Sequence, residues 1–287
     1  MSTLALPGPT PRRHTRTSTV VRPGPHTVGR ALRDAWRARE LLYLLVARDV
    51  KLRYKQTAIG AAWVLAQPVL TIAVVAVVFG RIADLNSDRV PYPLFAMTGW
   101  LPWMYLSSAV ALVTLSLVTD QSLLTKANFP RLLIPLTKAV RPLIDLVLGL
   151  GLMVPMMLWY EVAPTWRVAA LPLCALYALV VALGVGLWLA PLNCRFRDVG
   201  NAVPFLVQVW MFSSPILYPA TLVPVEGHFL YALNPAVGVI ETFRWAVLGS
   251  ADLDVELLVV SSGVAAAVLL IGLLVFARAE RRLVDIL

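Results

Sequence analysis

Six long, mostly uncharged stretches follow one another along this chain, and this pattern constrains the fold more than any other feature. A helix needs about 20 apolar residues to cross the hydrocarbon core of a bilayer. Only 14% of the 287 residues are charged, whereas soluble domains average about 25%. The expected spans are approximately residues 61–81, 95–118, 135–159, 168–191, 201–219 and 257–277. The sequence therefore predicts an all-α integral membrane protein with six transmembrane helices.

Charge in the connections between these spans predicts the topology independently of hydropathy. Cytoplasmic connections are enriched in Lys and Arg, and 12 of the 25 Lys and Arg residues precede the first span. The later connections on the same side carry Lys126, Arg131, Arg195, Arg197, Arg278, Arg281 and Arg282. We therefore expect a multi-pass protein of the plasma (inner) membrane with cytoplasmic N- and C-termini. The net charge of +9 then reflects orientation and anionic membrane lipids, not nucleic acid.

Four regions are expected along the chain. Residues 1–28 form a disordered cytoplasmic tail, residues 29–58 an amphipathic interface helix, residues 59–280 the six-span domain and residues 281–287 a cytoplasmic C-terminus. In the second region, apolar side chains at 42, 43, 45, 46, 50 and 54 share one helical face, opposite the basic side chains at 48, 51 and 55. Asp49 and Arg53 lie on the apolar face, where an unpaired charge is costly, so each should have a partner.

The segment between spans five and six is too apolar for an ordinary solvated loop. Residues 229–249 are predicted to form two short helices, because the residue before Pro235 disfavours helix and places a break at Asn234. We expect short re-entrant helices on the outer face, since polar backbone at membrane depth needs protein around it. An ordinary helix in an outer loop is the alternative.

Motifs for nucleotide binding and hydrolysis are missing from the sequence. It contains no GxxxxGK[ST], HExxH or GxSxG motif, and Cys174 and Cys194 have no metal-ligand spacing. We therefore expect no catalytic residue, no metal and no cofactor on this chain. The one charged cluster within a span is Lys138, Arg141 and Asp145. It indicates either a structural pair between Arg141 and Asp145 or a basic lining that meets a phosphate group.

Two polar connections on the cytoplasmic side stand out in so apolar a chain. They are DQSLLTKANFPR at residues 120–131 and NCRFRDVGN at residues 193–201. Each is short, charged and followed at once by a span. Simple turns of a membrane bundle would account for them, but a docking surface for a soluble partner explains their polarity better.

A set of spaced residues resembles a known family. Asp49, Lys51, Arg53, Tyr54, Thr57, Gly60, Trp63 and Pro68 match the start of the ABC-2 type permeases that export polysaccharides, such as O-antigen and teichoic acid. Val50 and Ile59 are mild departures from the usual Ile or Leu. Further landmarks are Asn128-Phe129-Pro130, Asn193, Arg197-Asp198, Ser214-Pro215-Ile216 and Asn234-Pro235. The resemblance covers about residues 30–280.

This resemblance implies a homodimer bound to two copies of a separate ABC ATPase, which would hold the ATP and Mg. The helix before span one would be a gate where a lipid-linked glycan arrives, and its diphosphate would meet Arg48, Asp49, Lys51, Arg53, Tyr54 and Lys55. Residues that contact the ATPase would be Asp120, Lys126, Asn128, Pro130, Arg131, Arg195, Arg197 and Asp198. Aromatic side chains offer flat surfaces to a sliding glycan; the pore-lining candidates are Trp63, Trp100, Trp103, Tyr105, Phe205, Trp210, Phe212 and Tyr218.

The expected function is that of a transport subunit, not an enzyme: the permease of an ATP-driven exporter of a lipid-linked polysaccharide or cell-wall polymer. Alternatives are an ABC-2 permease for small drugs or antibiotics and a polytopic transferase acting on lipid-linked sugars. A transferase would need a cluster of Asp, Glu or His at a membrane face, and the sequence offers none. The identity and length of the polymer cannot be deduced from the sequence.

Overall fold

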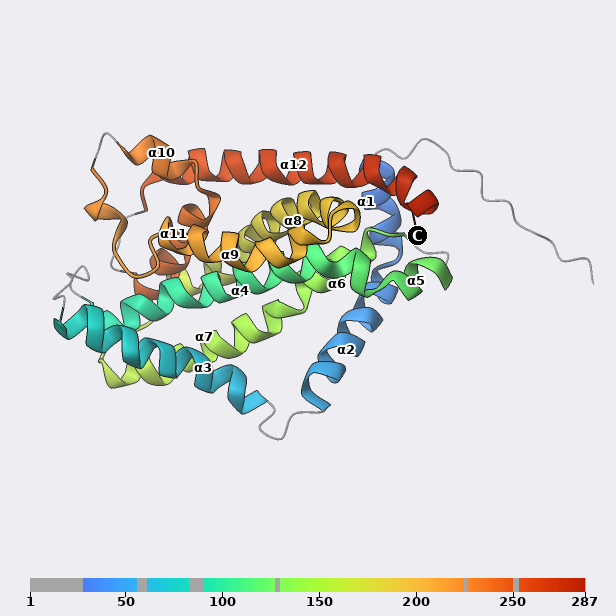
Figure 1. Cartoon of the computed structure of the whole chain (residues 1–287). Coiled ribbons are helices and arrows are strands. Elements are labelled where there is room, and N and C mark those ends of the chain that lie inside the picture. Colours follow the sequence, from blue (N-terminus) through green and yellow to red (C-terminus); the bar gives the residue numbers. More distant parts are fainter. Residues whose placement is uncertain are drawn as a thin grey trace, which may run out of the picture.

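The computed structural model describes residues 28–55, 61–82, 90–126, 130–224, 227–249 and 253–286, and in these ranges the secondary structure is helical throughout (Figure 1). Five segments among them are long and apolar enough to cross a membrane: Trp63–Gly80, Tyr92–Thr119, Leu133–Trp159, Trp166–Arg195 and Val255–Glu280. They agree with five of the six predicted spans. The predicted tail, Thr57, Gly60, Asn128 and Phe129 lie outside the described residues, as do the side chains of Tyr54 and Lys126.

The long helices form a bundle around α4 (Tyr92–Thr119). Helix α4 packs against α3 (Ala61–Val75), α6 (Leu133–Val140), α7 (Pro142–Trp159) and α8 (Leu171–Arg195). Its face toward these neighbours is lined by Leu94, Met97, Leu106, Val110, Val113 and Leu117, which are fully buried. Helix α12 (Val255–Ile286) packs along α8 on the other side of the bundle (Figure 1). An apolar helix can be buried on several sides only at such a centre.

The predicted third span is one run of helix with an interruption near its start. Helix α6 ends at Val140 and α7 begins at Pro142, while Arg141 between them keeps helical dihedral angles, with φ of −54° and ψ of −48°. Proline has no N–H, so the carbonyl of Lys138 loses its usual helical partner at this point. The interruption therefore coincides with the predicted charged cluster.

The predicted fifth span, residues 201–219, differs in the structure. Helix α9 runs only from Asp198 to Phe212. At about 1.5 Å per residue its 15 residues extend roughly 22 Å, which is short of the hydrocarbon core of about 30 Å. The Ser213–Pro215 sequence ends the helix, and a turn of 3₁₀-helix follows at Ala220–Leu222. Helix α9 nevertheless runs alongside the long helices (Figure 1).

The basic segment before the first span forms two helices, α1 (Val28–Arg37) and α2 (Arg39–Lys55), where one helix over 29–58 was expected. They lie across the ends of the long helices (Figure 1). Leu41, Leu42 and Leu45 pack onto the bundle. Tyr43, predicted on the apolar face, is exposed: at 100° per residue it lies about 120° around α2 from Asp49, which is buried on the side toward the bundle.

The segment between α9 and α12 folds into two helices separated at Asn234, as the Asn-Pro pair predicts. Helix α10 spans His228–Ala232 and α11 spans Pro235–Leu248. Asn234 caps α11 by accepting a hydrogen bond from the N–H of Ala236 at 3.1 Å. Gly249 ends α11 with a left-handed φ of 65°, which glycine adopts without steric cost. Most of α11 is buried against α4, α8 and α12.

Helices α8 and α12 approach each other at two glycines. A Cβ atom at Gly184 would lie 2.8 Å from the backbone nitrogen of Leu269, and one at Gly272 would overlap the carbonyl oxygen of Gly184. Small residues permit this kind of backbone contact between membrane helices. Gly263, also on α12, has nothing within 4 Å of such a Cβ.

We expect Gly184→Ala to destabilise the protein by about 1–3 kcal/mol, because backbone, which cannot move aside, occupies the space for the new methyl group. The matched control is Gly263→Ala, which should be neutral or stabilising by up to about 1 kcal/mol since alanine favours helix. Thermal unfolding in detergent measures both. Equal stability of the two variants would contradict the close contact.

Candidate functional site

A cluster of four charged side chains joins α2 to the membrane helices. Asp49 of α2 is only 5% exposed, and its Oδ2 accepts a hydrogen bond from Nζ of Lys138 on α6 at 2.7 Å. Nζ of Lys138 also lies 2.8 Å from Oδ2 of Asp120, at the C-terminal end of α4. Lys138 therefore bridges two carboxylates that belong to two different helices.

Arg48 completes this cluster and balances its charge. Its Nη2 lies 2.8 Å from Oδ1 of Asp49 and 3.6 Å from Oδ1 of Asp120. With two cations and two carboxylates, the cluster is neutral when all four groups are ionised. Burial alone would raise the pKa of Asp49, but hydrogen bonds and charge from Lys138 and Arg48 outweigh it and lower that pKa. Asp49 is therefore ionised at neutral pH.

A second ion pair lies further along α2. Nη1 of Arg53 is 2.9 Å from Oδ2 of Asp145 on α7. Asp49 and Arg53, the two charges that interrupt the apolar face of α2, thus each have a partner of opposite charge. Asp145 thus binds Arg53 of α2, and the expected i,i+4 pairing of Asp145 with Arg141 stays a prediction.

A cavity of about 240 Å³ begins at the Arg53–Asp145 pair and extends between α3, α4 and α7. Aromatic rings and small polar groups line it: Trp63, Gln67, Trp100, Trp103, Tyr105, Ser107 and Ser108. Nε1 of Trp100 is buried and has no hydrogen-bond partner within the described part of the chain. A buried donor without an acceptor is unfavourable.

Four of the eight predicted pore-lining aromatics meet at this cavity. Trp63 is half exposed at this cavity, which Arg53 of α2 also lines. Trp103 is nearly buried and packs edge-on against Trp210 of α9, with ring centroids 5.5 Å apart. The hydroxyl of Tyr105 donates to the carbonyl of Ala139 at 3.2 Å. These contacts hold the rings of the cavity wall in place.

The remaining aromatics are placed elsewhere. Phe205 and Phe212 are exposed on the outside of α9, away from the cavity. Trp210 donates from Nε1 to Oδ1 of Asn234 at 2.7 Å, and so fixes the end of α9 to the start of α11. The hydroxyl of Tyr218 lies 3.3 Å from that of Tyr231 at the α10–α11 end.

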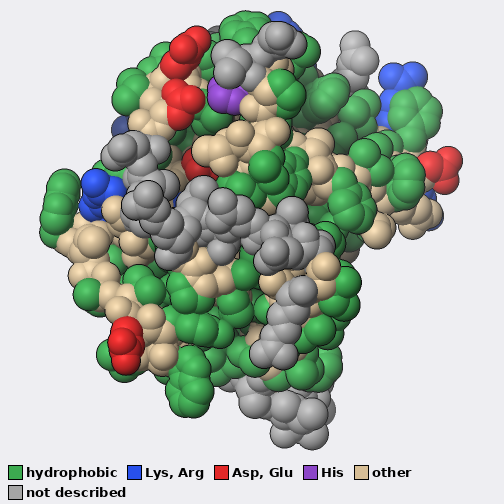
Figure 2. Space-filling model, turned by 90° about the vertical axis from the view of Figure 1, so that its left-hand side faces the viewer, with side chains coloured by type: hydrophobic (Ala, Val, Ile, Leu, Met, Phe, Trp, Pro, Cys, Tyr) green, Lys and Arg blue, Asp and Glu red, His purple; other side chains and the backbone are tan. Residues whose placement is uncertain are grey.

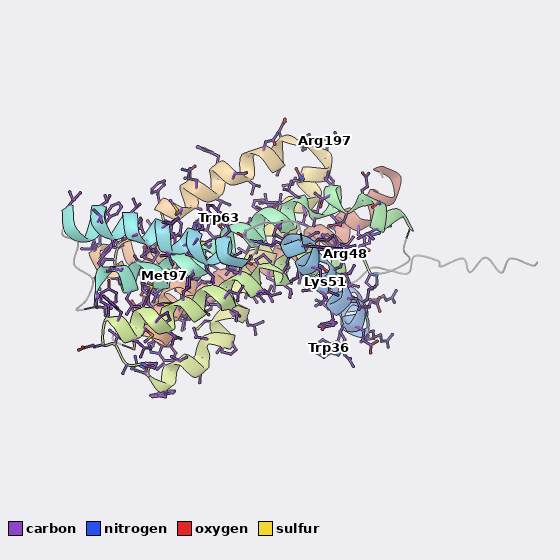
Figure 3. All side chains as sticks on the ribbon, turned by 90° about the horizontal axis from the view of Figure 1, so that it is seen from below. Trp36, Arg48, Lys51, Trp63, Met97 and Arg197 are labelled. Atoms are coloured by element: carbon purple, nitrogen blue, oxygen red, sulfur yellow. The ribbon has the colours of Figure 1, made fainter. Side chains whose placement is uncertain are left out.

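The predicted ATPase-contacting residues divide into two groups. Asp120 points inward to Lys138, and Nη1 of Arg131 donates to the carbonyl of Glu280 on α12 at 2.8 Å. Arg195, Arg197 and Asp198 are exposed where α8 turns into α9, and Arg197 extends outward in Figure 3. Asn193 holds this turn by accepting a hydrogen bond from the N–H of Gly200 at 2.8 Å. Pro130 is half-buried.

Two basic side chains of α2, Lys51 and Lys55, take part in none of these ion pairs. Lys51 and Lys55 are exposed, and Figure 3 places Lys51 on the open side of α2. Of the predicted charged cluster Lys138, Arg141 and Asp145, the first and last bind α2, and Arg141 lies between them at the start of α7. Lys138 therefore joins α2 to α6, and Asp145 joins α2 to α7.

Two features of the site were not anticipated from the sequence. Asp120 was predicted to face an ATPase, but it is also the second carboxylate of the Lys138 bridge. Gln67, on α3 between Trp63 and Val69, lines the cavity and was not singled out. A signal for Gln67 was available, because it is one of few amide side chains inside a predicted span.

Loss of Lys138 should cost more than loss of Asp49. Lys138→Met leaves Asp49 and Asp120 with Arg48 as their one remaining partner in the cluster, and breaking a buried pair costs about 3–5 kcal/mol. Asp49→Ala leaves Lys138 with Asp120 and should cost less. The variant that carries both Asp49→Ala and Lys138→Met should lose less stability than the two single variants lose when their losses are added. Thermal unfolding in detergent measures these effects, with Lys51→Met as an exposed control; strictly additive losses would argue against the bridge.

Comparison with known proteins places this geometry in a family context. The profile of the ABC-2 type transporter family matches residues 40–248, which include α2, the cavity and α11. The chain is 32% identical over 217 residues to the O-antigen export system permease protein RfbA of Myxococcus xanthus, covering 75% of this chain and 83% of that protein. A Klebsiella pneumoniae protein of the same name is 25% identical over 86% of this chain and 95% of its own length. The polysialic acid transport protein KpsM of Escherichia coli is 23% identical over 71% of this chain and 80% of its own length.

Proposed function

Because the chain belongs to the ABC-2 type transporter family, we propose that it is the membrane-spanning permease subunit of an ATP-driven exporter. Its cargo would be a lipid-linked polysaccharide or cell-wall polymer. The named relatives, which act in O-antigen export and polysialic acid transport, support a glycan over a small drug. The observation that carries the mechanism is the Lys138 bridge, because it joins the basic helix α2 to the end of α4 that continues into α5 (Gln121–Lys126).

The bridge offers a direct path from a partner ATPase to α2. We propose that two copies of a separate ATPase, which hold the ATP and Mg, dock at α5 and at the turn that carries Arg195 and Arg197. Movement of α5 would shift Asp120, and Lys138 would pass that shift to Asp49 on α2. A buried bridge transmits such a shift because separating its charges is costly.

The substrate would arrive beside α2 at the inner headgroups. The exposed Lys51 and Lys55 and the half-exposed Arg48 offer cations to the diphosphate of a lipid carrier. The adjoining cavity, lined by aromatic rings and small polar groups, suits a sugar ring, which presents both hydroxyl groups and C–H faces. The ion pairs of Asp49 with Lys138 and of Arg53 with Asp145 hold α2 beside this cavity.

Six passes through the inner membrane, with both termini cytoplasmic, complete the proposal. Helix α9 and the segment after it would form the fifth pass, and α10 and α11 would be a re-entrant pair on the outer face. The burial of α11 against α4, α8 and α12 supports its insertion into the bundle. The exposed apolar side chains of α3 and α9, among them Val69, Val74, Phe205 and Phe212, support a second copy of the chain as a neighbour.

Export should depend on the ion pairs that hold α2 against the bundle. We expect Asp49→Ala and Arg53→Ala to lower export within the range of about 5–150-fold that is usual for coupling between sites, while the protein still inserts and still binds its ATPase. The measurement is surface glycan, by immunoblot of cells that produce the chain with its ATPase. ATP hydrolysis by the purified complex should persist, because the variants disconnect transport from hydrolysis.

Arg33→Ala, on the exposed side of α1, is the control for these two variants. If cells with Asp49→Ala and cells with Arg53→Ala both show normal surface glycan at normal protein levels, the proposed role of α2 is refuted. Purified chain that transfers a lipid-linked sugar without any ATPase would instead favour a transferase.

The docking site can be tested by crosslinking. A cysteine at position 122, on exposed α5, should crosslink to the ATPase in membranes, in a background where Cys174 and Cys194 are replaced by alanine. A cysteine at position 230, exposed on α10, is the matched control and should not react with the ATPase. Crosslinks from position 230 alone would invert the proposed orientation.

A further inference from the structure

A second cavity lies at the opposite end of the molecule from α2. It has a volume of about 330 Å³ and is enclosed by the start of α4, by α10 and α11, and by the start of α12. Figure 2 shows this end of the molecule, where acidic and histidine side chains gather among hydrophobic ones. The polar side chains that line the cavity are His228, Tyr231, Glu241, Arg244 and Asp254, and Trp245 adds an aromatic ring.

Arg244 forms the rigid base of this cavity. The side chain is only 3% exposed, although the sequence placed it in an outer connection. Its Nη1 donates to Oε1 of Glu241 at 2.8 Å, and its Nη2 donates to the carbonyl of Ile216 at 3.0 Å. The guanidinium also lies 3.9 Å from the centre of the Phe95 ring. These contacts fix both the guanidinium and the Glu241 carboxylate in place.

The charge of the lining disfavours an anionic ligand. Arg244 is already matched by Glu241, and Asp254 adds a further carboxylate. A phosphate or an acidic sugar would therefore be repelled. A metal ion is also disfavoured, because the described residues include no group of three His, Cys, Asp or Glu side chains that could hold one.

The hydrogen-bonding groups match an uncharged ligand with several hydroxyl groups. His228 places Nε2 2.9 Å from the carbonyl of Val223, so Nε2 is the donor and Nδ1, where it carries no proton, can accept. Tyr231 donates to the hydroxyl of Tyr218, which leaves the Tyr231 oxygen able to accept. Glu241 and Asp254 are further acceptors at the wall. Hydroxyl groups donate to all four.

We propose that this cavity binds one uncharged sugar ring of the glycan as it leaves the membrane. The acceptors that line it suit the hydroxyl groups of a pyranose, and the rings of Tyr231 and Trp245 in its lining suit the C–H face. The inference rests on the proposed function for its substrate class, but it concerns a different site from the cavity beside α2. It gives each subunit its own contact with the emerging polymer.

The test uses the full-length chain with its ATPase in lipid nanodiscs. The probes are the neutral methyl pyranosides of glucose, galactose, mannose and N-acetylglucosamine, with glucose 6-phosphate as an anionic comparison. Ligand-observed NMR and isothermal titration measure binding. We expect at least one neutral glycoside to bind and glucose 6-phosphate to bind more weakly.

Two variants locate any binding. Asp254→Asn keeps a side-chain oxygen that can cap α12, because Asn caps helices as well as Asp does, so the fold should persist. It should weaken the neutral glycoside about tenfold or more, since a hydrogen bond to a charged group is lost. Trp245→Leu should weaken it as well. Glu256→Gln, exposed in the first turn of α12 and outside the cavity, is the matched control and should bind as the parent does.

Three results would overturn the inference: no binding of any neutral glycoside, equal binding by the parent and both variants, or tighter binding of glucose 6-phosphate. Surface glycan in cells producing the parent chain is followed in parallel. If the parent restores surface glycan while one of these three results is obtained, the outer site fails and the proposed function stands. If the parent restores no glycan, the proposed function fails whatever the cavity binds.

Discussion

The position of α2 depends on one physical constraint, the cost of burying a carboxylate at a membrane surface. Asp49 is buried on the face of α2 that meets the bundle, and it stays charged because Lys138 and Arg48 surround it. Lys138 satisfies Asp120 at the same time, so the requirement of one buried charge connects three helices. The Arg53–Asp145 pair adds a fourth helix, α7. The basic helix is thereby held at a fixed angle across the bundle, with Lys51 and Lys55 left facing outward.

Much of the architecture could be predicted from the sequence, because hydrophobic length is a direct physical requirement of crossing a bilayer. Five of the expected spans correspond to long helices, and the Asn-Pro pair marks the break before α11. The fifth expected span shows that the number of consecutive uncharged residues does not by itself give the length of a helix. Residues 201–219 are uncharged throughout, yet the Ser-Ser-Pro sequence ends α9 at Phe212, and hydropathy does not record where backbone hydrogen bonds stop.

The candidate site could be predicted in part, for a similar reason. The helical wheel indicated that Asp49 and Arg53 need partners, but it could not identify them, since Lys138 is 89 positions from Asp49 in the chain. Asp145 likewise receives Arg53 from a helix distant in the chain, which local spacing does not reveal. Arg244 lies in the segment expected on the outer face, and its position three residues after Glu241, within an apolar run, is the signal of a buried pair.

The glycine contact between α8 and α12 has a consequence for motion. Backbone that touches backbone at Gly184 and Gly272 cannot slide without steric overlap, so these two helices and α4 beside them should move as one rigid unit. Among the described long helices, α3 packs mainly against α4 and α7, and Val203 is the one side chain of α9 that is buried. Any opening of the subunit is therefore expected to be a hinge of α3 and α9 against a stationary centre, which leaves the α10–α11 cavity intact while the side of the bundle opens.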